Sequence, residues 1–328
     1  MQPAPTVEDY GGRTLPNGIA FNGWTFETSE GSIASAAELA ELKRKMTEAA
    51  ATNEALPKLP EAIFANNRLV MTHVASKQSL TFDAEGCLTD WLKNSLKHGA
   101  GGLTIPAASL GSWKEKVQQQ TGDSTRPDWD WTFTNSYSGI GADADGGPLA
   151  WAKHGGDGID MQLLRKREPI LFFADLPFYT DDLHDNGLSE TRLRIRVMPS
   201  CFFVLLRHYL RVDGSLIRQR DARFFVRFSG GGGGPPKLIR LLRLGTCALP
   251  PLPTAPPEDG PRSPGGTLVE GGTMDTPRPN GVPGAQPLAI LPDEQTAADK
   301  LGSLPAEMEI VEELTLEGAA SVGSMTIS

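Results

Sequence analysis

The sequence is poor in cysteine, in long apolar runs and in targeting signals. Its three cysteines, Cys87, Cys201 and Cys247, are odd in number and widely spaced, which argues against a disulfide framework and against a clustered zinc site. Reduced thiols in the cytosol are the simplest interpretation. No stretch approaches about 18 uninterrupted apolar residues, so we expect no transmembrane helix. The first residues lack the basic and apolar regions of a signal peptide, so the sequence predicts a cytoplasmic protein, with the nucleus as an open alternative.

Catalytic signatures and an excess of basic charge are also missing. The five histidines belong to no motif, and no G-x-S-x-G elbow places a serine nucleophile. The glycine-rich GAGGLT at 99–104 lacks the Lys-Ser/Thr ending of a phosphate-binding loop. A net charge of −9 argues against a general nucleic-acid binder, which needs a basic surface. We expect neither catalytic residues nor a cofactor.

One acidic group raises the question of a metal site. Asp181, Asp182, His184 and Asp185 lie within five residues. A calcium loop needs oxygen ligands at regular spacing around a defined turn, and this segment lacks that spacing. The sequence therefore favours an acidic loop that caps a strand, and we expect no bound metal.

The richest part of the sequence is the stretch 183–225, which is dense in apolar and aromatic residues. From Thr191 to Met198, apolar Leu193, Ile195 and Val197 alternate with three arginines. This period of two is typical of a strand with one buried face and one wet face. Pro199 is expected to end it, since proline has no N–H to donate to a ladder.

The next segment, Cys201 to Val212, opens with six apolar residues and fits either a buried helix or a buried strand. The Asp213-Gly214 dipeptide that follows favours a two-residue hairpin turn, because a type I′ turn needs positive φ at both central residues. Leu216 to Arg218 then returns as the partner strand. We therefore predict a strand followed by a hairpin.

Arginine is concentrated in this stretch. Nine arginines lie between Thr191 and Arg227, against only Asp213 and Asp221. One interpretation is that these arginines line the wet face of a sheet. The other is a face that receives an acidic partner. The residue types alone leave both open.

Elsewhere the patterns predict a helix from Ala34 to Ala51, with Ser35 as its N-cap and Glu38 at the capping-box position. A stripe of Leu39, Leu42 and Met46 gives it one apolar face. Pro177 is expected to break the apolar run that starts at Ile170. Short segments predict further strands or a helix: strands at 19–27, 69–74, 79–82 and 129–134, a short helix around 87–92, and a strand or short helix at 170–173. Together they predict an α+β fold, with a mainly antiparallel β-sheet core, a few peripheral helices and a disordered C-terminal tail.

Several phrases in the sequence resemble the TIPRL family, the TOR signalling pathway regulator-like proteins. The similarity covers roughly 21–224 and is strongest from Leu163 to Phe224. It rests on LLRKREPILFFADLPFYTDDLHDNG, on LHDNGLSETRLRIRVMP, on RIRVMPSCFFVLLRHYLRVDGSLIR and, further upstream, on DWDWTFTNSYSG. The resemblance implies a single α+β domain built on antiparallel strands. It also implies a non-catalytic regulator that binds the catalytic subunits of type 2A serine/threonine phosphatases in TOR signalling.

The resemblance further implies a groove that receives the extended C-terminal tail of the phosphatase catalytic subunit. We expect Ile159 and Asp160 on one side of it, and Arg218 and Asp221 beside the hairpin on the other. Ile159 is an apolar residue among glycines and acids that no amphipathic pattern explains. Asp221 would lie just past a strand end, where it can accept N–H groups of an extended peptide. The alternative is that Asp221 forms an ion pair with Arg220 or Arg223.

Two other functions stay open at this point. An arginine and aromatic sheet face also suits single-stranded nucleic acid, although the overall acidity disfavours it. An enzyme of unrecognised class is the third alternative, since residues far apart in sequence can assemble a site.

Composition divides the chain into four parts. Residues 1–18 form a loose tail and 19–227 form the domain, while 228–290 is a Gly/Pro-rich segment expected to be disordered and 291–328 is an acidic tail. Within the third part, 238–244 (LIRLLRL) is an apolar and basic island that suggests a transient helix. A helix is also expected at 306–314. The family continues after the hairpin into further ordered strands, and the sequence after Phe225 carries no recognisable counterpart.

Overall fold

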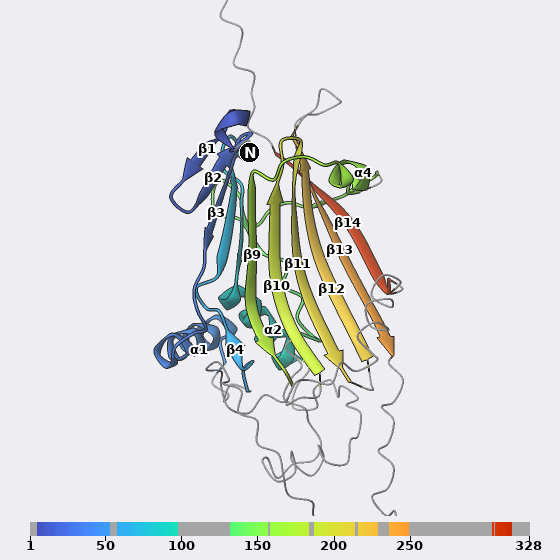
Figure 1. Cartoon of the computed structure of the whole chain (residues 1–328). Helices are drawn as coiled ribbons and strands as arrows, with labels where there is room; N and C mark the ends of the chain where they lie inside the picture. Colours follow the sequence, from blue (N-terminus) through green and yellow to red (C-terminus); the bar gives the residue numbers. More distant parts are fainter. Residues whose placement is uncertain are drawn as a thin grey trace, which may run out of the picture.

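The computed structural model describes residues 5–52, 58–97, 132–156, 158–183, 187–213, 216–228, 236–248, 304 and 306–316. These residues form two antiparallel sheets, with a few helices at the ends of the sheets (Figure 1). The predicted α+β class with a mainly antiparallel core is confirmed. No helix among the described residues is both long enough and apolar enough to cross a bilayer.

The first sheet has six strands in the order β1-β2-β3-β5-β6-β7. It follows a single 3-10 turn, η1 (Glu8–Tyr10). Neighbouring strands are mostly consecutive in the chain, so short turns join them. The strands are β1 (Arg13–Leu15), β2 (Gly18–Phe21), β3 (Trp24–Ser29), β5 (Arg68–His73), β6 (Ser79–Asp83) and β7 (Ile140–Ala142).

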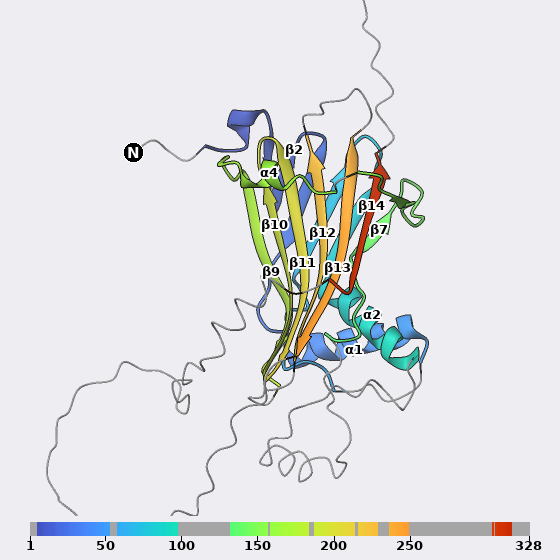
Figure 2. The same cartoon turned by 90° about the vertical axis from the view of Figure 1, so that its right-hand side faces the viewer.

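The second sheet has eight strands in the order β4-β9-β10-β11-β12-β13-β14-β8. The central five are long and strongly twisted, and they form one wall of the molecule (Figure 2). The strands are β4 (Ala62–Ile63), β8 (Ala152–Lys153), β9 (Phe172–Asp181), β10 (Gly187–Val197), β11 (Cys201–Val212), β12 (Leu216–Arg227), β13 (Lys237–Ala248) and β14 (Met308–Thr315).

The main core lies between the two sheets, and aromatic rings join them. Phe202 of β11 makes edge contacts with Trp24 and Phe26 of β3, with ring centroids 5.0 and 5.1 Å apart. Phe224 of β12 meets Phe82 of β6 at 5.2 Å. Trp24 and Phe26 share the inner face of β3, as the sequence predicted. Because these rings are large and buried, their contacts contribute strongly to the stability of the fold.

Among the described residues, three α-helices border the sandwich. Both views place α1 (Ala36–Ala50) and α2 (Ala84–Lys97) at the end opposite α4 (Met161–Arg165) (Figures 1 and 2). The predicted capping box is confirmed, because the Ser35 side chain accepts from the Glu38 N–H while the Glu38 carboxylate accepts from Ser35. Leu42 and Met46 bury the predicted stripe of α1. The helix predicted around 87–92 is α2, and Cys87, Leu88, Trp91 and Leu92 are buried in it.

The segment predicted as one strand at 19–27 is instead a hairpin of β2 and β3. Asn22 and Gly23 form its turn, with φ values of 46° and 79°. Positive φ at two successive residues is what a type I′ turn requires, and Asn-Gly is the dipeptide that best provides it. The sequence contained this signal, and the prediction overlooked it.

Two details of the predicted strands are wrong. Pro177 does not break the apolar run but lies inside β9, at a bulge in the pairing with β10. Proline is accepted there because β4 pairs with β9 only further along, at Tyr179 and Thr180, so no partner strand needs an N–H from residue 177. Of the strand predicted at 129–134, residues 132–134 form a turn, and the rest lies outside the described residues.

The end of the domain also differs from the prediction. Residues 238–244 belong to strand β13, not to a transient helix, and the helix expected at 306–314 is strand β14. Both extend the second sheet past residue 227, where the sequence placed the end of the domain. The hairpin before them is longer than predicted. Its ladder closes at Val212 and Leu216, so three residues form the connection, and Gly214 lies outside the described residues.

A polar network lies inside the main core around His208. Its Nε2 is 3.0 Å from the Tyr137 carbonyl oxygen, which can only accept, so Nε2 carries the proton. Its Nδ1 therefore accepts from the Thr191 hydroxyl at 2.8 Å. Burial and, to a smaller extent, the charge of Arg220 lower the pKa of His208 to about 4. The neutral imidazole is the form that the fold accommodates.

This network predicts a loss of stability in mild acid. The folded-state pKa lies below the unfolded value of about 6.5, so the stabilisation is complete above that pH and is lost as the pH falls towards 4. From about pH 7.5 to about 5, the wild type should lose about 2 kcal/mol more unfolding free energy than His208→Gln, whose amide keeps both hydrogen bonds without titrating. Urea unfolding at the two pH values measures the difference. Equal losses in the two proteins would mean that His208 does not titrate as described.

Candidate functional site

One face of the eight-stranded sheet packs on the six-stranded sheet, and we call the opposite face the outer face. Burial alternates along β10 and, from Phe202 onward, along β11, so that even-numbered residues of β11 are buried and the odd-numbered ones after Cys201 are partly exposed. Leu193, Ile195 and Val197 are buried and the intervening arginines face outward, as the sequence predicted. The arginines of β10 therefore all lie on the outer face.

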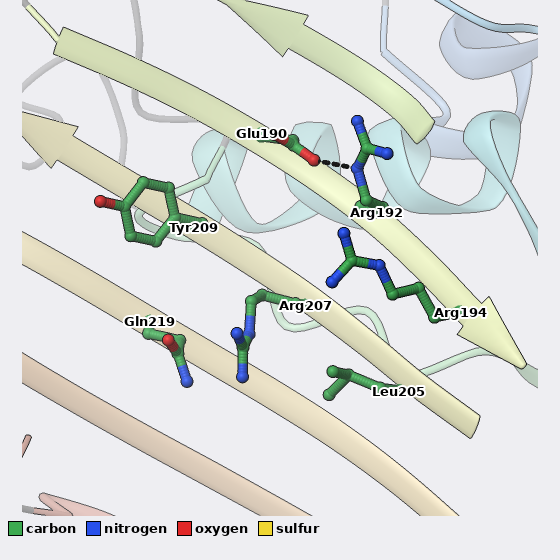
Figure 3. A pocket seen from close by; sticks show the side chains of 7 residues that line it. All are labelled: Glu190, Arg192, Arg194, Leu205, Arg207, Tyr209 and Gln219. Carbon is green, nitrogen blue, oxygen red and sulfur yellow. Dashed lines mark hydrogen bonds and ion pairs between the residues drawn. The ribbon is translucent and has the colours of Figure 1, made fainter. Parts of the chain in front are cut away.

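A shallow hollow of about 190 Å³ lies in the middle of the outer face, across β10, β11 and β12. Figure 3 shows its side chains rising from three neighbouring strands on the same side of the sheet. Four of the seven are guanidinium or aromatic groups, which suit an extended polar ligand. The lining residues are Glu190, Arg192, Arg194, Leu205, Arg207, Tyr209 and Gln219.

The carboxylate of Asp221 lies beside this hollow and holds neighbouring side chains in place by hydrogen bonds. Its side chain is 1% exposed, and its carboxylate accepts two hydrogen bonds from Arg207, at 2.8 and 2.9 Å. Arg223 adds a bond at 2.6 Å and Gln219 one at 3.1 Å. Burial alone would raise the pKa of Asp221, but the hydrogen bonds and charge of Arg207 and Arg223 outweigh it, so its pKa lies below the usual range.

A second set of ion pairs lies across β9 and β10. Arg192 bonds Glu190, and also Asp175 at 3.1 Å, while Arg194 directs its Nε at the other Asp175 oxygen, also at 3.1 Å. Arg194 is half exposed. In the part of the chain that the structure describes, it makes this one bond, which leaves its two terminal amino groups for a ligand.

The outer face is less positive than the count of nine arginines against two acids implied. Arg218 and Arg220 point to the inner face, because they share it with the buried Ala222, Phe224 and Val226 of β12. The remaining arginines are matched in part by acids from other strands, Asp175 and Glu190 among them. The outer face therefore offers oriented N–H donors more than a large net charge.

Ile159 and Asp160 lie at the end of the outer face that α4 covers. Ile159 is buried with Leu163, Phe225 and Ile239 in a small cluster under α4, which accounts for its apolar character. Asp160 is the N-cap of α4: its Oδ1 accepts from the Leu163 N–H at 2.8 Å, and its Oδ2 bonds Arg227. Hydrogen bonding to backbone N–H groups, chiefly that of Leu163, lowers the pKa of Asp160.

The structure does not bring the four predicted groove residues together. Arg218 lies on the inner face, with its guanidinium 4.0 Å from the centre of the Phe133 ring and bonded to Thr246. Asp221 lies on the outer face, in the middle of β12 and not past a strand end. It is six residues from Arg227, the partner of Asp160, which is about 20 Å along a strand. Of the expected ion pairs of Asp221, the one with Arg223 is present and Arg220 faces the other way.

The acidic residues at the end of β9 lie where the chain turns, and one of them caps the backbone there. Asp181 is buried, and its carboxylate accepts from the N–H groups of Glu61 and Leu183 at 3.0 and 2.8 Å. Oxygens of Glu61, Asp181 and Asp182 lie within 4.8 Å of one another, but these backbone bonds already give Asp181 a role in capping the turn. His184 and Asp185 lie outside the described residues.

Comparison of the sequence with known proteins gives the family of this chain. The model of the TIP41-like family matches residues 62–242, more than half of the chain. The chain belongs to the TIP41-like family. A TIP41-like protein of Arabidopsis thaliana is 33% identical over 250 residues, covering 71% of this chain and 80% of the relative. The human TIP41-like protein is 32% identical over 210 residues, covering 63% and 70%.

A more distant relative carries a functional name. The type 2A phosphatase activator TIP41 of Saccharomyces cerevisiae is 27% identical over 226 residues, covering 64% of this chain and 58% of the relative. The resemblance to the TOR signalling pathway regulator-like proteins is thereby confirmed as membership of the TIP41-like family. The match runs through the first half of β13, so the family similarity does not stop at Phe225.

Sequence reasoning missed the paired hydrogen bonds between Arg207 and Asp221. The Asp213-Gly214 signal indicated the wrong register, because the ladder closes at Val212 and Leu216 and places Arg207 directly opposite Asp221. A two-residue turn would have paired Asp221 with Leu206 instead. Asp175 was missed because β9 was predicted to end before Pro177.

The Asp221 network gives a direct test of stability. Asp221→Asn should lower the unfolding free energy by about 3 kcal/mol, because it leaves two partly buried guanidinium groups without their shared counter-ion. Asp175→Asn serves as the control and should cost less than about 1 kcal/mol, since the Asp175 side chain is itself 28% exposed, against 1% for Asp221. Denaturant melts at neutral pH measure both. Similar losses for the two variants would contradict the central position given to Asp221.

Proposed function

We propose that this protein is a non-catalytic regulator that binds the catalytic subunit of type 2A serine/threonine phosphatases and modulates TOR signalling. Family membership supports the phosphatase connection, through the name of the yeast relative. The structural observation that supports this site is the arrangement of the outer face. There Asp175, Glu190 and Asp221 hold guanidinium groups in place beside a hollow. Such a face suits recognition of a polypeptide and offers no nucleophile paired with a base.

The partner segment in this proposal is the C-terminal tail of the catalytic subunit. An extended tail presents backbone carbonyl groups and a terminal carboxylate, and both accept N–H bonds from arginine. The hollow is about 190 Å³, enough for one or two side chains of such a segment and too small for a folded element. Tyr209 and Leu205 offer apolar area beside the guanidinium groups.

The track proposed for the tail runs along the outer face from α4 to the hollow. Asp160 lies at one end of it and Asp221 beside the other. In this arrangement Asp221 does not contact the tail, because arginine and Gln219 already occupy its oxygens, and it acts as a positioning residue for Arg207 and Arg223. Ile159 supports α4 from below. Arg218 lies on the other face and is left out of the track.

The test is binding of purified full-length protein to an unmodified type 2A catalytic subunit. Arg194→Glu should weaken binding about tenfold or more, because it replaces an N–H donor with a like charge for the tail carboxylate. Arg44→Glu on α1 makes the same charge change at a site of equal exposure and should leave the affinity unchanged. Arg218→Gln should also bind as the wild type does. Circular dichroism confirms that each variant is folded.

The outcomes separate this function from its alternatives. If Arg194→Glu and Arg44→Glu bind the catalytic subunit equally well, the tail does not dock on the outer face. If Arg218→Gln loses binding while Arg194→Glu keeps it, the site lies on the inner face. If the wild type ignores the catalytic subunit but shifts single-stranded nucleic acid, the regulator proposal fails.

A further inference from the structure

Strand β14 reaches its place by an unusual route. It pairs directly with β13, yet 59 residues, 249–307, separate the two strands in the sequence. The intervening sequence is rich in proline and glycine. A long connection adds little to the entropy of closing a loop, since each doubling of its length costs only about 0.6 kcal/mol. The long connection does, however, allow β14 to detach from the sheet without moving β13, the strand that precedes it in the sequence.

The pairing of β14 is one-sided. Its ladder with β13 covers eight residue pairs, from Lys237 with Thr315 to Leu244 with Met308. Its other edge meets only the two-residue β8, together with a bond from the His154 N–H to the Val311 carbonyl at 3.0 Å. Among the described residues, no strand covers the other edge of 308–310. Ile310 there is 41% exposed.

Charge complementarity holds β14 in place. Residues 306–316 contain glutamates and no basic residue. Glu312 bonds Arg240 at 2.6 Å, and Glu313 bonds both Lys237, at 2.9 Å, and His154, at 2.6 Å. Glu309 lies 3.9 Å from Arg243. The hydrogen bond from Lys237, followed by that from His154, lowers the pKa of Glu313, so its carboxylate is ionised at neutral pH.

Two leucines supply the apolar part of the contact. Leu314 and Leu316, at the C-terminal end of β14, are buried in the main core. The rest of the strand is partly or fully exposed. The strand is therefore held by an acidic pair followed by Leu-x-Leu, a short pattern that a foreign segment can reproduce.

We propose that β14 is a detachable strand, and that the edge of β13 beneath it is a second docking site, for an extended partner segment with two acidic residues followed by Leu-x-Leu. Adding a strand to a sheet edge is a common mode of peptide recognition, in which the main chain gives affinity and alternate side chains give specificity. Here the chain's own C-terminal segment occupies the edge. This surface is separate from the outer-face hollow and does not depend on the phosphatase proposal.

Tethering sets the behaviour to expect. A segment that belongs to the same chain competes as an intramolecular ligand, at an effective concentration of up to about a millimolar, so an outside peptide binds the wild type weakly. Releasing β14 removes this competitor. Opening of a strand that only the short β8 covers costs less than global unfolding, so it occurs while the rest of the sheet stays paired.

The first test measures binding of a fluorescent peptide with the sequence of residues 306–316 to three full-length proteins. The double variant Glu312→Lys, Glu313→Lys repels its own β14 and should bind the peptide about tenfold or more tightly than the wild type. The control Glu41→Lys, Glu48→Lys on α1 makes the same change in net charge and should bind as weakly as the wild type. A peptide with glutamine at the positions of Glu312 and Glu313 should bind the double variant less well.

Equal affinity in all three proteins would overturn the proposal, and so would tight binding to the control. Concentration-dependent dimers of the wild type that the double variant does not form would show that the occupant is β14 of a second copy. That result would also overturn the proposal of a foreign segment.

A second measurement needs no variant and covers the case in which the double variant does not fold. Hydrogen exchange of the wild type should show β14 amides losing about tenfold protection between about 50 mM and about 500 mM salt, because salt screens the ion pairs. Amides of β10 and β11 should keep theirs. Unchanged protection of β14 would mean that the strand is a fixed part of the sheet.

Discussion

The packing of the six-stranded sheet on one face of the eight-stranded sheet determines what the other face can do. Aromatic contacts such as Phe202 with Trp24, and Phe224 with Phe82, hold the sheets together. Because side chains alternate along each strand, every buried residue of β10 and β11 leaves an outward neighbour. The same contact that stabilises the fold therefore arranges arginine, tyrosine and glutamine into one surface.

Register decides the chemistry of that surface. Asp221 faces Arg207 only because the β11 and β12 ladder closes at Val212 and Leu216. A slip of one residue would move Asp221 opposite an apolar side chain and turn the arginines of one strand to the other face. The buried carboxylate then orients two guanidinium groups and is itself removed from contact with a partner. Asp221 therefore supports the outward-facing guanidinium groups of Arg207 and Arg223.

Much of this could be predicted from the sequence, because strong local patterns agreed with the final fold. Strict alternation in 191–198, the capping box at Ser35 and the apolar positions of α2 all gave the correct element. The candidate site was harder. Arg218 and Asp221 are three residues apart and so point to opposite faces of a strand, which makes a shared groove impossible without a bulge. Ile159 became interpretable only when the cluster under α4 was known.

The last two strands were missed for a different reason. In β13, Leu238 and Leu242 face inward while Ile239 and Leu241 face outward, so no alternation marks it as a strand. In β14, a glutamate-rich sequence has a local preference for helix, and pairing with the arginines of β13 overrides it. Each of these two segments forms a strand because it pairs with a neighbouring strand, and a prediction that considers one segment at a time cannot detect such pairing.

The central claim is that the outer face of the eight-stranded sheet docks the phosphatase tail. The most direct measurement replaces Leu205, beside the hollow, with a photo-cross-linking amino acid, and in a second protein replaces Val74, an exposed residue next to the first sheet. After irradiation with the type 2A catalytic subunit, residue 205 should cross-link to the C-terminal tail of that subunit and residue 74 should not. Cross-linking from residue 74 alone would contradict the account.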